Sequence, residues 1–102
     1  MGELTVNHFL FLSAALFIIG MMGVLTRRNM LIILMCVELM VAAVSISFVA
    51  FAWENNTLGG QIFVLFMLAI AAAESAVGLG ILLALSRRGK SVDVDDLQEL
   101  RD

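Results

Sequence analysis

The sequence predicts an all-α membrane protein with three transmembrane helices. Of its 102 residues, 62% are hydrophobic, and the mean hydropathy is +1.04, whereas soluble domains are about 45–50% apolar. The charged residues are clustered, which leaves three apolar stretches near residues 4–26, 30–53 and 61–86. Each is long enough for a helix that crosses a hydrocarbon core about 30 Å thick. We therefore expect one membrane domain, residues 1–102, embedded in the lipid bilayer.

The composition also argues against several other classes of protein. A single Cys excludes a disulfide scaffold. Six Lys and Arg residues against nine Asp and Glu residues, a net charge of −3, predict no nucleic-acid partner. An outer-membrane barrel requires alternating apolar and polar residues, and residues 31–35 are apolar throughout. The absence of Pro is typical of uninterrupted helices.

The first and second stretches are separated by a short basic loop. The first, 4–26, carries no charge and ends before Arg27 and Arg28. No basic residue precedes it, so its polarity is wrong for a cleaved signal peptide. The second stretch, 30–53, contains a single charged residue, Glu38.

The third stretch, 61–86, follows a polar loop at residues 54–60 and also contains one charged residue, Glu74. Beyond it lies an acidic tail, residues 87–102. Residues 93–101 have acids at their start, as the helix dipole favours, and could form a short helix. We expect a solvated tail there, because chain ends are seldom tied down.

The basic residues predict the orientation in the membrane. Arg27 and Arg28 lie between the first two stretches, and Arg87, Arg88 and Lys90 follow the third. Both clusters therefore fall on one side, and Lys and Arg collect on the cytoplasmic side. We expect the N-terminus outside, the C-terminus in the cytoplasm, and a multi-pass protein of the cell (inner) membrane.

Glu38 and Glu74 are the candidate functional residues. Glu38 comes ten residues after Arg28 and Glu74 thirteen residues before Arg87, about 15 and 20 Å along a helix. Both therefore lie near the middle of the bilayer, where an ionised side chain costs at least about 2.5–3.5 kcal/mol. Desolvation favours the neutral acid, and a carboxyl group that gains and loses a proton there suits proton transfer. The alternative is a neutral, hydrogen-bonded residue that joins helices.

The surroundings of the two glutamates predict neighbouring subunits. Ala42 and Ser45 share a narrow helix face with Glu38, and the residues around Glu74 are mostly Ala, Gly and Ser. Small residues let helix backbones approach closely. Three helices cannot bury all of these faces, so we expect contacts with other chains.

The remaining residues predict no catalytic group and no metal site in this chain. His and Cys form no cluster with metal-ligand spacing, and no glycine-rich nucleotide loop is present. His8 is expected at the outer interface, and Cys36 is expected to be a small packing residue.

Three segments resemble a known family. GVLTRRN at residues 23–29, CVELM at 36–40 and AAAESAVGL at 71–79 are similar to subunit K of the proton-pumping NADH-quinone oxidoreductase, respiratory complex I. The resemblance covers nearly the whole chain, including the length, the three stretches and the spacing of the glutamates. One departure concerns Ala42, Ser45 and Ser47, where the family usually has Asn on the second helix. Ala lacks the hydrogen-bonding groups of Asn.

The resemblance implies a membrane-arm subunit that couples quinone reduction to proton translocation. Glu38 and Glu74 match the family's two membrane glutamates, which belong to a chain of buried ionisable residues. Arg27 and Arg28 primarily indicate the orientation of the chain in the membrane. They are also candidates for a proton entrance on the cytoplasmic side. The chain itself would bind no cofactor, since quinone, FMN and iron–sulfur clusters belong to other subunits. Its partners would include an antiporter-like subunit.

Three other functions remain open from the sequence. The first alternative is the small subunit of a multi-subunit cation/proton antiporter, which would use the same glutamates without quinone. A ring subunit of a rotary ATPase also has a mid-helix carboxylate, although such subunits typically have two helices and one carboxylate. A purely structural assembly subunit is the last alternative.

Overall fold

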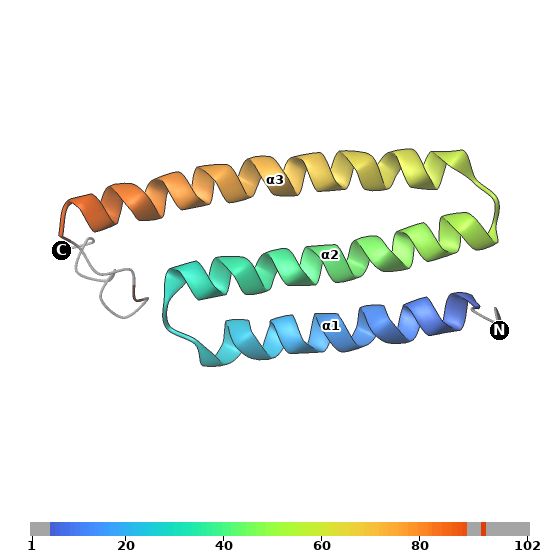
Figure 1. Ribbon diagram of the computed structural model, residues 1–102, viewed down its shortest axis with the longest axis horizontal. Coiled ribbons are helices and arrows are strands. Elements are labelled where there is room, and N and C mark those ends of the chain that lie inside the picture. Colours follow the sequence, from blue (N-terminus) through green and yellow to red (C-terminus); the bar gives the residue numbers. More distant parts are fainter. Residues whose placement is uncertain (1–4, 90–92, 94–102) are drawn as a thin grey trace.

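The computed structural model describes residues 5–89 and 93, and these residues form three helices (Figure 1). They are α1, Val6–Thr26, α2, Met30–Glu54, and α3, Leu58–Arg87. All three are long and apolar enough to cross a membrane. The prediction of an all-helical protein with three membrane-spanning helices is thus confirmed.

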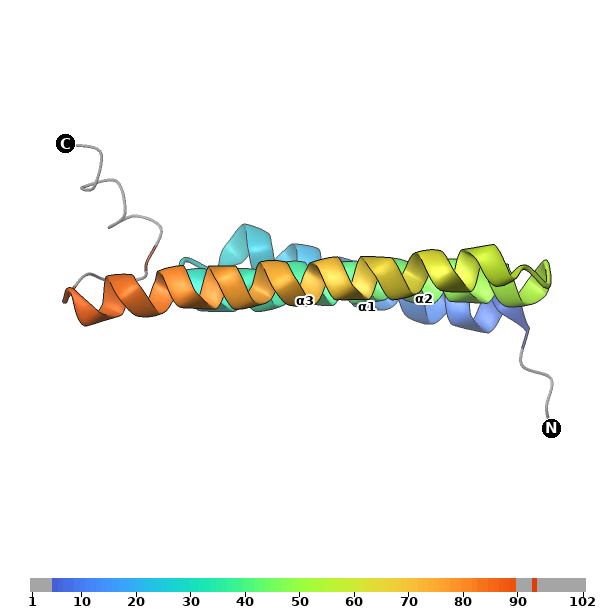
Figure 2. The same ribbon diagram turned by 90° about the horizontal axis from the view of Figure 1, so that it is seen from above.

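The helices lie side by side in one layer, with α2 in the middle (Figures 1 and 2). Only short turns join them, at residues 27–29 and 55–57, so consecutive helices run antiparallel. α2 packs against both α1 and α3. The positions of α1 and α3 relative to each other are therefore set mainly by their separate contacts with α2.

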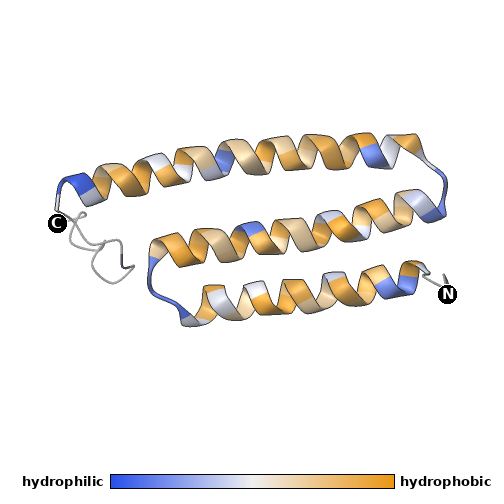
Figure 3. Cartoon of the chain, in the orientation of Figure 1, coloured by the Kyte–Doolittle hydropathy of each residue, from blue (hydrophilic) through white to orange (hydrophobic). Residues whose placement is uncertain are grey.

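Small residues form the interior of this layer. Among residues 5–89 and 93, the buried apolar residues are few, and no large side chain is fully buried. They are Ala43, Ala50, Ala52, Val64 and Ala71. Large apolar side chains such as Phe11, Leu25 and Phe66 instead face outward, and apolar residues cover most of each helix (Figure 3). Such a surface requires lipid or another apolar chain around it.

α1 and α2 approach most closely at two glycines. A Cβ atom added at Gly20 would lie 2.7 Å from Met40 Cγ and 2.9 Å from the Cys36 carbonyl oxygen. A Cβ atom at Gly23 would collide with Cys36 Sγ. The half-buried Cys36 is therefore a packing residue, as expected, and both glycines are required for the close approach.

α2 and α3 meet through a second set of contacts. Gly60 lies against Ala52, and Gly78 lies against the Leu34 side chain. Between them, the rings of Phe48 and Phe63 stack edge to face with centroids 5.3 Å apart. This geometry is favourable for aromatic pairs.

Local hydrogen bonds fix where the helices begin. Asn29 Oδ1 accepts a hydrogen bond from the Leu31 N–H at 2.8 Å and caps α2. At the start of α1, the Thr5 N–H donates to His8 Nδ1 at 3.0 Å. His8 is exposed there, so its ring satisfies a backbone donor at the helix end.

The third helix begins at Leu58, three residues earlier than the sequence predicts. Asn56 adopts a left-handed conformation, with φ 57°, and the Thr57 N–H donates to the Ala52 carbonyl, which completes the turn early. Helix formation continues through Gly60 because its missing side chain leaves room for Ala52. Polarity alone suggested a longer loop, whereas close packing determines the helix start.

Substitution of Gly20 by Ala should destabilise the pair α1–α2. The added methyl group meets a backbone carbonyl that cannot rotate away, and such overpacking typically costs about 1–3 kcal/mol. Thermal unfolding of the purified chain in detergent micelles measures the change. Gly80→Ala is the matched control, because nothing lies within 4 Å of its added Cβ, and it should stabilise α3 by about 0.5–1 kcal/mol. Equal effects of the two variants would contradict the packing described.

Candidate functional site

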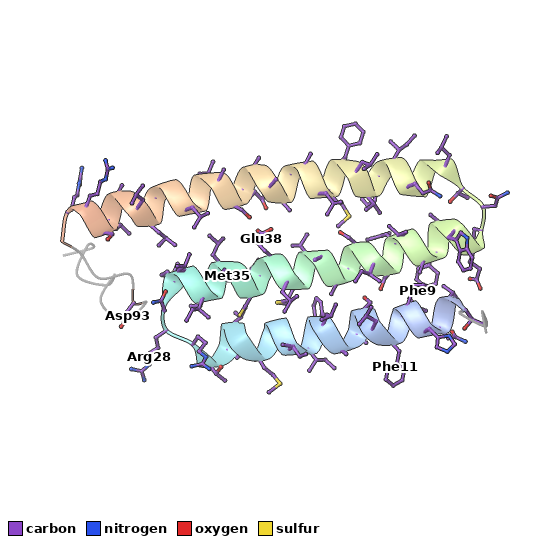
Figure 4. All side chains as sticks on the ribbon, viewed as in Figure 1. Phe9, Phe11, Arg28, Met35, Glu38 and Asp93 are labelled. Carbon is purple, nitrogen blue, oxygen red and sulfur yellow. The ribbon has the colours of Figure 1, made fainter. Side chains whose placement is uncertain are left out.

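Glu38 lies on the side of α2 that faces α3. Its side chain is half-buried, and Figure 4 shows it directed toward α3. Leu34, one helical turn earlier, contacts Gly78 of α3, and residues four apart share a helix face. The carboxyl group of Glu38 is thus located at the α2–α3 contact and not on the α1 side.

The register of the two helices brings Glu38 and Glu74 to the same level. Ala52 contacts Gly60 and Leu34 contacts Gly78, so the same number of residues separates the two contacts on both helices. Glu38 comes four residues after Leu34, and Glu74 comes four residues before Gly78. Since the helices are antiparallel, the two glutamates lie at equal depth on neighbouring helices.

Glu74 lies at the edge of the α3 face that packs on α2. It follows the buried Ala71 by three residues, which places it about 60° around the helix. Its side chain is exposed. One chain therefore leaves this carboxyl group open on its outer side, in an environment where a bare charge is unfavourable.

The serines of α2 do not extend a polar path from Glu38. Ser47 comes nine residues later, on the opposite side of the helix, where its hydroxyl lies 2.6 Å from that of Ser13 in α1. The buried Ser13 in turn donates to the Ala43 carbonyl, so Ser47 is the donor in the pair. These bonds join α1 to α2.

Ser45 shares the Glu38 side of α2, but its hydroxyl is already used. Ser45 Oγ donates to the Val41 carbonyl of its own helix at 2.9 Å, and Ala42 offers no polar side-chain atom. The expected small face of Glu38, Ala42 and Ser45 exists, although it offers no free donor along α2.

The basic clusters lie at one end of the layer. Arg27 and Arg28 are exposed at the α1–α2 turn, and Arg87 and Arg88 are exposed at the end of α3, at the same end (Figure 1). Glu38 is eight residues into α2, about 12 Å along the axis. The structure therefore brings the glutamates together at one level and the arginines together at one end, as two separate groups.

Asp93, beyond α3, also lies at this basic end. The backbone of Asp93 pairs with that of Asn29 in an isolated antiparallel bridge, and Figure 4 shows Asp93 and Arg28 at this end. Asp93, which belongs to the tail expected to be solvated, is thus paired with the α1–α2 turn through its backbone. The rest of residues 93–101, which could form a short helix but were expected to be a solvated tail, lies outside the described residues.

Residues 5–89 and 93 contain no group of three or more His, Cys, Asp or Glu side chains that could hold a metal ion. Within the same residues, every buried side-chain nitrogen or oxygen atom has a hydrogen-bond partner. The chemistry of the site is therefore that of two carboxyl groups in an apolar layer.

Comparisons with known proteins agree with the resemblance. The family described as NADH-ubiquinone/plastoquinone oxidoreductase chain 4L matches residues 8–102. NADH-quinone oxidoreductase subunit K of Thermomicrobium roseum is 63% identical, and the alignment covers all of both chains. The subunit K of Dechloromonas aromatica is 52% identical over 99% of each chain. That of Nitrosomonas eutropha is 50% identical over 95% of this chain and 97% of its own.

A designed disulfide tests the register of α2 and α3 that places the two glutamates at the same depth. In a Cys36→Ala background, Leu34→Cys with Gly78→Cys should cross-link readily under mild oxidation in membranes. The reason is that a Cβ atom at Gly78 lies 3.2 Å from the Leu34 side chain, and a disulfide requires such proximity. Leu34→Cys with Gly80→Cys is the control and should stay reduced. Mass spectrometry of the digested chain detects the bond, and preferential linkage of the control pair would show a different register.

Proposed function

We propose, from the premise that the chain belongs to the NADH-ubiquinone/plastoquinone oxidoreductase chain 4L family, that Glu38 and Glu74 transfer protons within the membrane part of the complex. The chain is a multi-pass membrane subunit of an oxidoreductase complex, and other subunits of that complex are its partners. The observation that carries the proposal is the equal depth of the two carboxyl groups on neighbouring helices.

The energetics support a role in which each carboxyl group changes its charge. An ionised carboxylate in hydrocarbon costs at least about 2.5–3.5 kcal/mol, so protonation is favourable unless a cation or water is near. Glu38, half-buried against α3, is screened from lipid by its own chain, and Glu74 is open on its outer side. Glu38 would hold a proton inside the chain, and Glu74 would exchange it with whatever group the neighbouring subunit presents.

The redox chemistry belongs to other subunits under this proposal. An iron–sulfur cluster is typically held by four Cys thiolates, and this chain contains one Cys. Quinone, FMN and the clusters would be bound elsewhere in the complex. This subunit would then act without a redox centre, as one part of the coupling between quinone reduction and proton translocation.

The exposed side of Glu74 suggests what its partner must provide. A neighbouring chain that covers this carboxyl group would need a basic or protonatable side chain at the same depth, since an uncompensated buried charge is strongly unfavourable. An antiporter-like membrane-arm subunit fits this requirement. Arg27 and Arg28, exposed at the turn, would attract proton-carrying anionic groups near a cytoplasmic entrance.

The alternative function, a small subunit of a cation/proton antiporter, uses the same glutamates. The relatives reported above are subunits of NADH-quinone oxidoreductase, which favours the first function. NADH-driven and sodium-driven proton movement in the same membranes would separate the two.

Replacement of either glutamate by Gln should block proton translocation while the complex still assembles. Gln keeps the shape of Glu but cannot bind and release a proton. Without a proton-binding group, a charge must cross this depth unaided; the cost of an ionised side chain there, at least about 2.5–3.5 kcal/mol, sets a lower limit of roughly 100-fold slower transfer. Proton uptake per NADH oxidised, measured in inverted membrane vesicles, is the test.

Glu54→Gln is the control for these variants, because Glu54 is an exposed carboxylate at the end of α2, away from the middle of the layer. It should pump normally. Normal pumping by both Glu38→Gln and Glu74→Gln would rule out the proton-transfer role. A loss of assembled complex with unchanged turnover of the remainder would indicate a structural subunit.

The proposed orientation places the N-terminus outside and the end of the layer that carries both basic clusters in the cytoplasm, with the subunit in the inner membrane. In a Cys36→Ala background, Asn56→Cys in the α2–α3 turn should react with a membrane-impermeant maleimide on intact spheroplasts. Arg88→Cys at the end of α3 should react only after permeabilisation, since the two sites are at opposite ends of the layer. The reverse pattern would invert the orientation.

A further inference from the structure

The first turn of α1 is closed by the side chain of His8. The Thr5 N–H donates to His8 Nδ1 at 3.0 Å, and the Thr5 hydroxyl lies 3.2 Å from the same nitrogen. In the other direction, the His8 N–H donates to the Thr5 carbonyl oxygen at 3.0 Å. This is the arrangement of a capping box, with His8 at the third helical position, where Glu or Gln is usual.

The hydrogen bond from Thr5 defines the protonation state of the ring. Because Nδ1 is the acceptor, it carries no proton, and the neutral ring has its proton on Nε2. In an imidazolium both ring nitrogens are donors. Protonation of His8 would therefore set a second donor against the Thr5 N–H and remove the cap. A Glu or Gln side chain at this position would remain an acceptor at neutral pH and in mild acid.

The charge of a protonated His8 opposes the closed turn as well. A cation near the N-terminus of a helix is unfavourable, because the helix dipole is positive there. An ionised side chain is also costly next to hydrocarbon, so an imidazolium favours a first turn that is open toward water. His8 is exposed, and a proton from the solvent can reach its ring.

The other titratable groups near His8 are acids. α1 packs on α2, whose titratable residue at this end is the exposed Glu54 (Figure 1). Between Leu58 and Glu74, α3 has no titratable residue. Glu3 and the terminal amine lie outside the described residues. Since carboxyl groups ordinarily lose their proton at lower pH than histidine, His8 is the described group at this end that changes charge between about pH 5 and 8.

The next hydrogen-bonded anchor of α1 lies eight residues after Thr5. The buried Ser13 donates to the Ala43 carbonyl, and its hydroxyl pairs with that of Ser47. These bonds to α2 contain no titratable group, so they hold α1 at Ser13 whatever the charge of His8. Opening of the capped turn is thus confined to the residues before Ser13, about two helical turns.

We propose that His8 is a pH-sensitive cap, which closes the first turn of α1 when its ring is neutral and opens it when the ring is protonated. The stabilisation of the turn is fully present at the higher pH and is lost as the pH falls through the titration of the ring. This switch does not depend on the proton transfer proposed for Glu38 and Glu74. Under the proposed orientation, it would respond to the pH outside the cytoplasm.

Amide hydrogen exchange of the full ¹⁵N-labelled chain, measured by NMR in uncharged micelles at about pH 7.5 and about pH 5, tests the proposal. The protection factor of the Thr5 amide, corrected for the intrinsic effect of pH, should be about fivefold lower at the lower pH, which is the scale of a lost helix cap. The amides from Ser13 onward in α1 should keep their protection. The imidazole ¹⁵N signals should show Nδ1 without a proton at the higher pH.

His8→Gln is the matched control, because Gln accepts the same hydrogen bond and does not titrate in this range. It should protect the Thr5 amide equally at both pH values, whereas His8→Ala should leave it unprotected at both. Equal protection of Thr5 at both pH values in the wild type would overturn the proposal, as would protection that survives in His8→Ala. A fall in His8→Gln as large as in the wild type would assign the effect to Glu3, Glu54 or the terminal amine and refute the histidine switch.

Discussion

In hydrocarbon, helices gain little by hiding apolar side chains from lipid, so their association depends on backbones that approach closely. In this chain the close approaches are made at α2, by Gly20 and Gly23 on one side and by Gly60 and Gly78 on the other. These contacts hold α2 in the middle of a single layer and fix the register of α3. The equal depth of Glu38 and Glu74 follows from that register.

The same packing leaves part of the chain without cover from its own helices. A single layer buries few residues, and these are mostly Ala. Glu38 gains partial cover from α3, whereas Glu74 stays exposed. Under the proposed function, a carboxyl group that is open on one side at mid-membrane depth suits a subunit that exchanges protons with a neighbour. The chain belongs to a family of oxidoreductase subunits, so other subunits of the complex are its neighbours.

The sequence predicts the elements well and their contacts poorly. Charge clustering defines three spans because an apolar run of sufficient length has few alternatives in a bilayer. The early start of α3 at Leu58 depends on the contact of Gly60 with Ala52, which involves two helices and so leaves no local signal. The position of Asp93 beside Asn29 is also a long-range contact. Glu38 and Glu74 could be chosen from composition, because charges inside spans are rare, but their common level required the register.

Ala42, Ser45 and Ser47 stand where the resemblance leads us to expect Asn, and this departure bears on the proposed proton path. Ser47 faces α1 and bonds to Ser13, Ser45 donates to its own helix, and Ala42 has no polar group. Beyond Glu38, the residues of α2 therefore offer no continuous chain of donors and acceptors toward the α2–α3 turn. The polar group that the register brings to the same level is Glu74 on the next helix. Under the proposed function, a proton held by Glu38 would accordingly move sideways, across the layer to α3 and on to the next subunit, and not along α2 to the nearer surface.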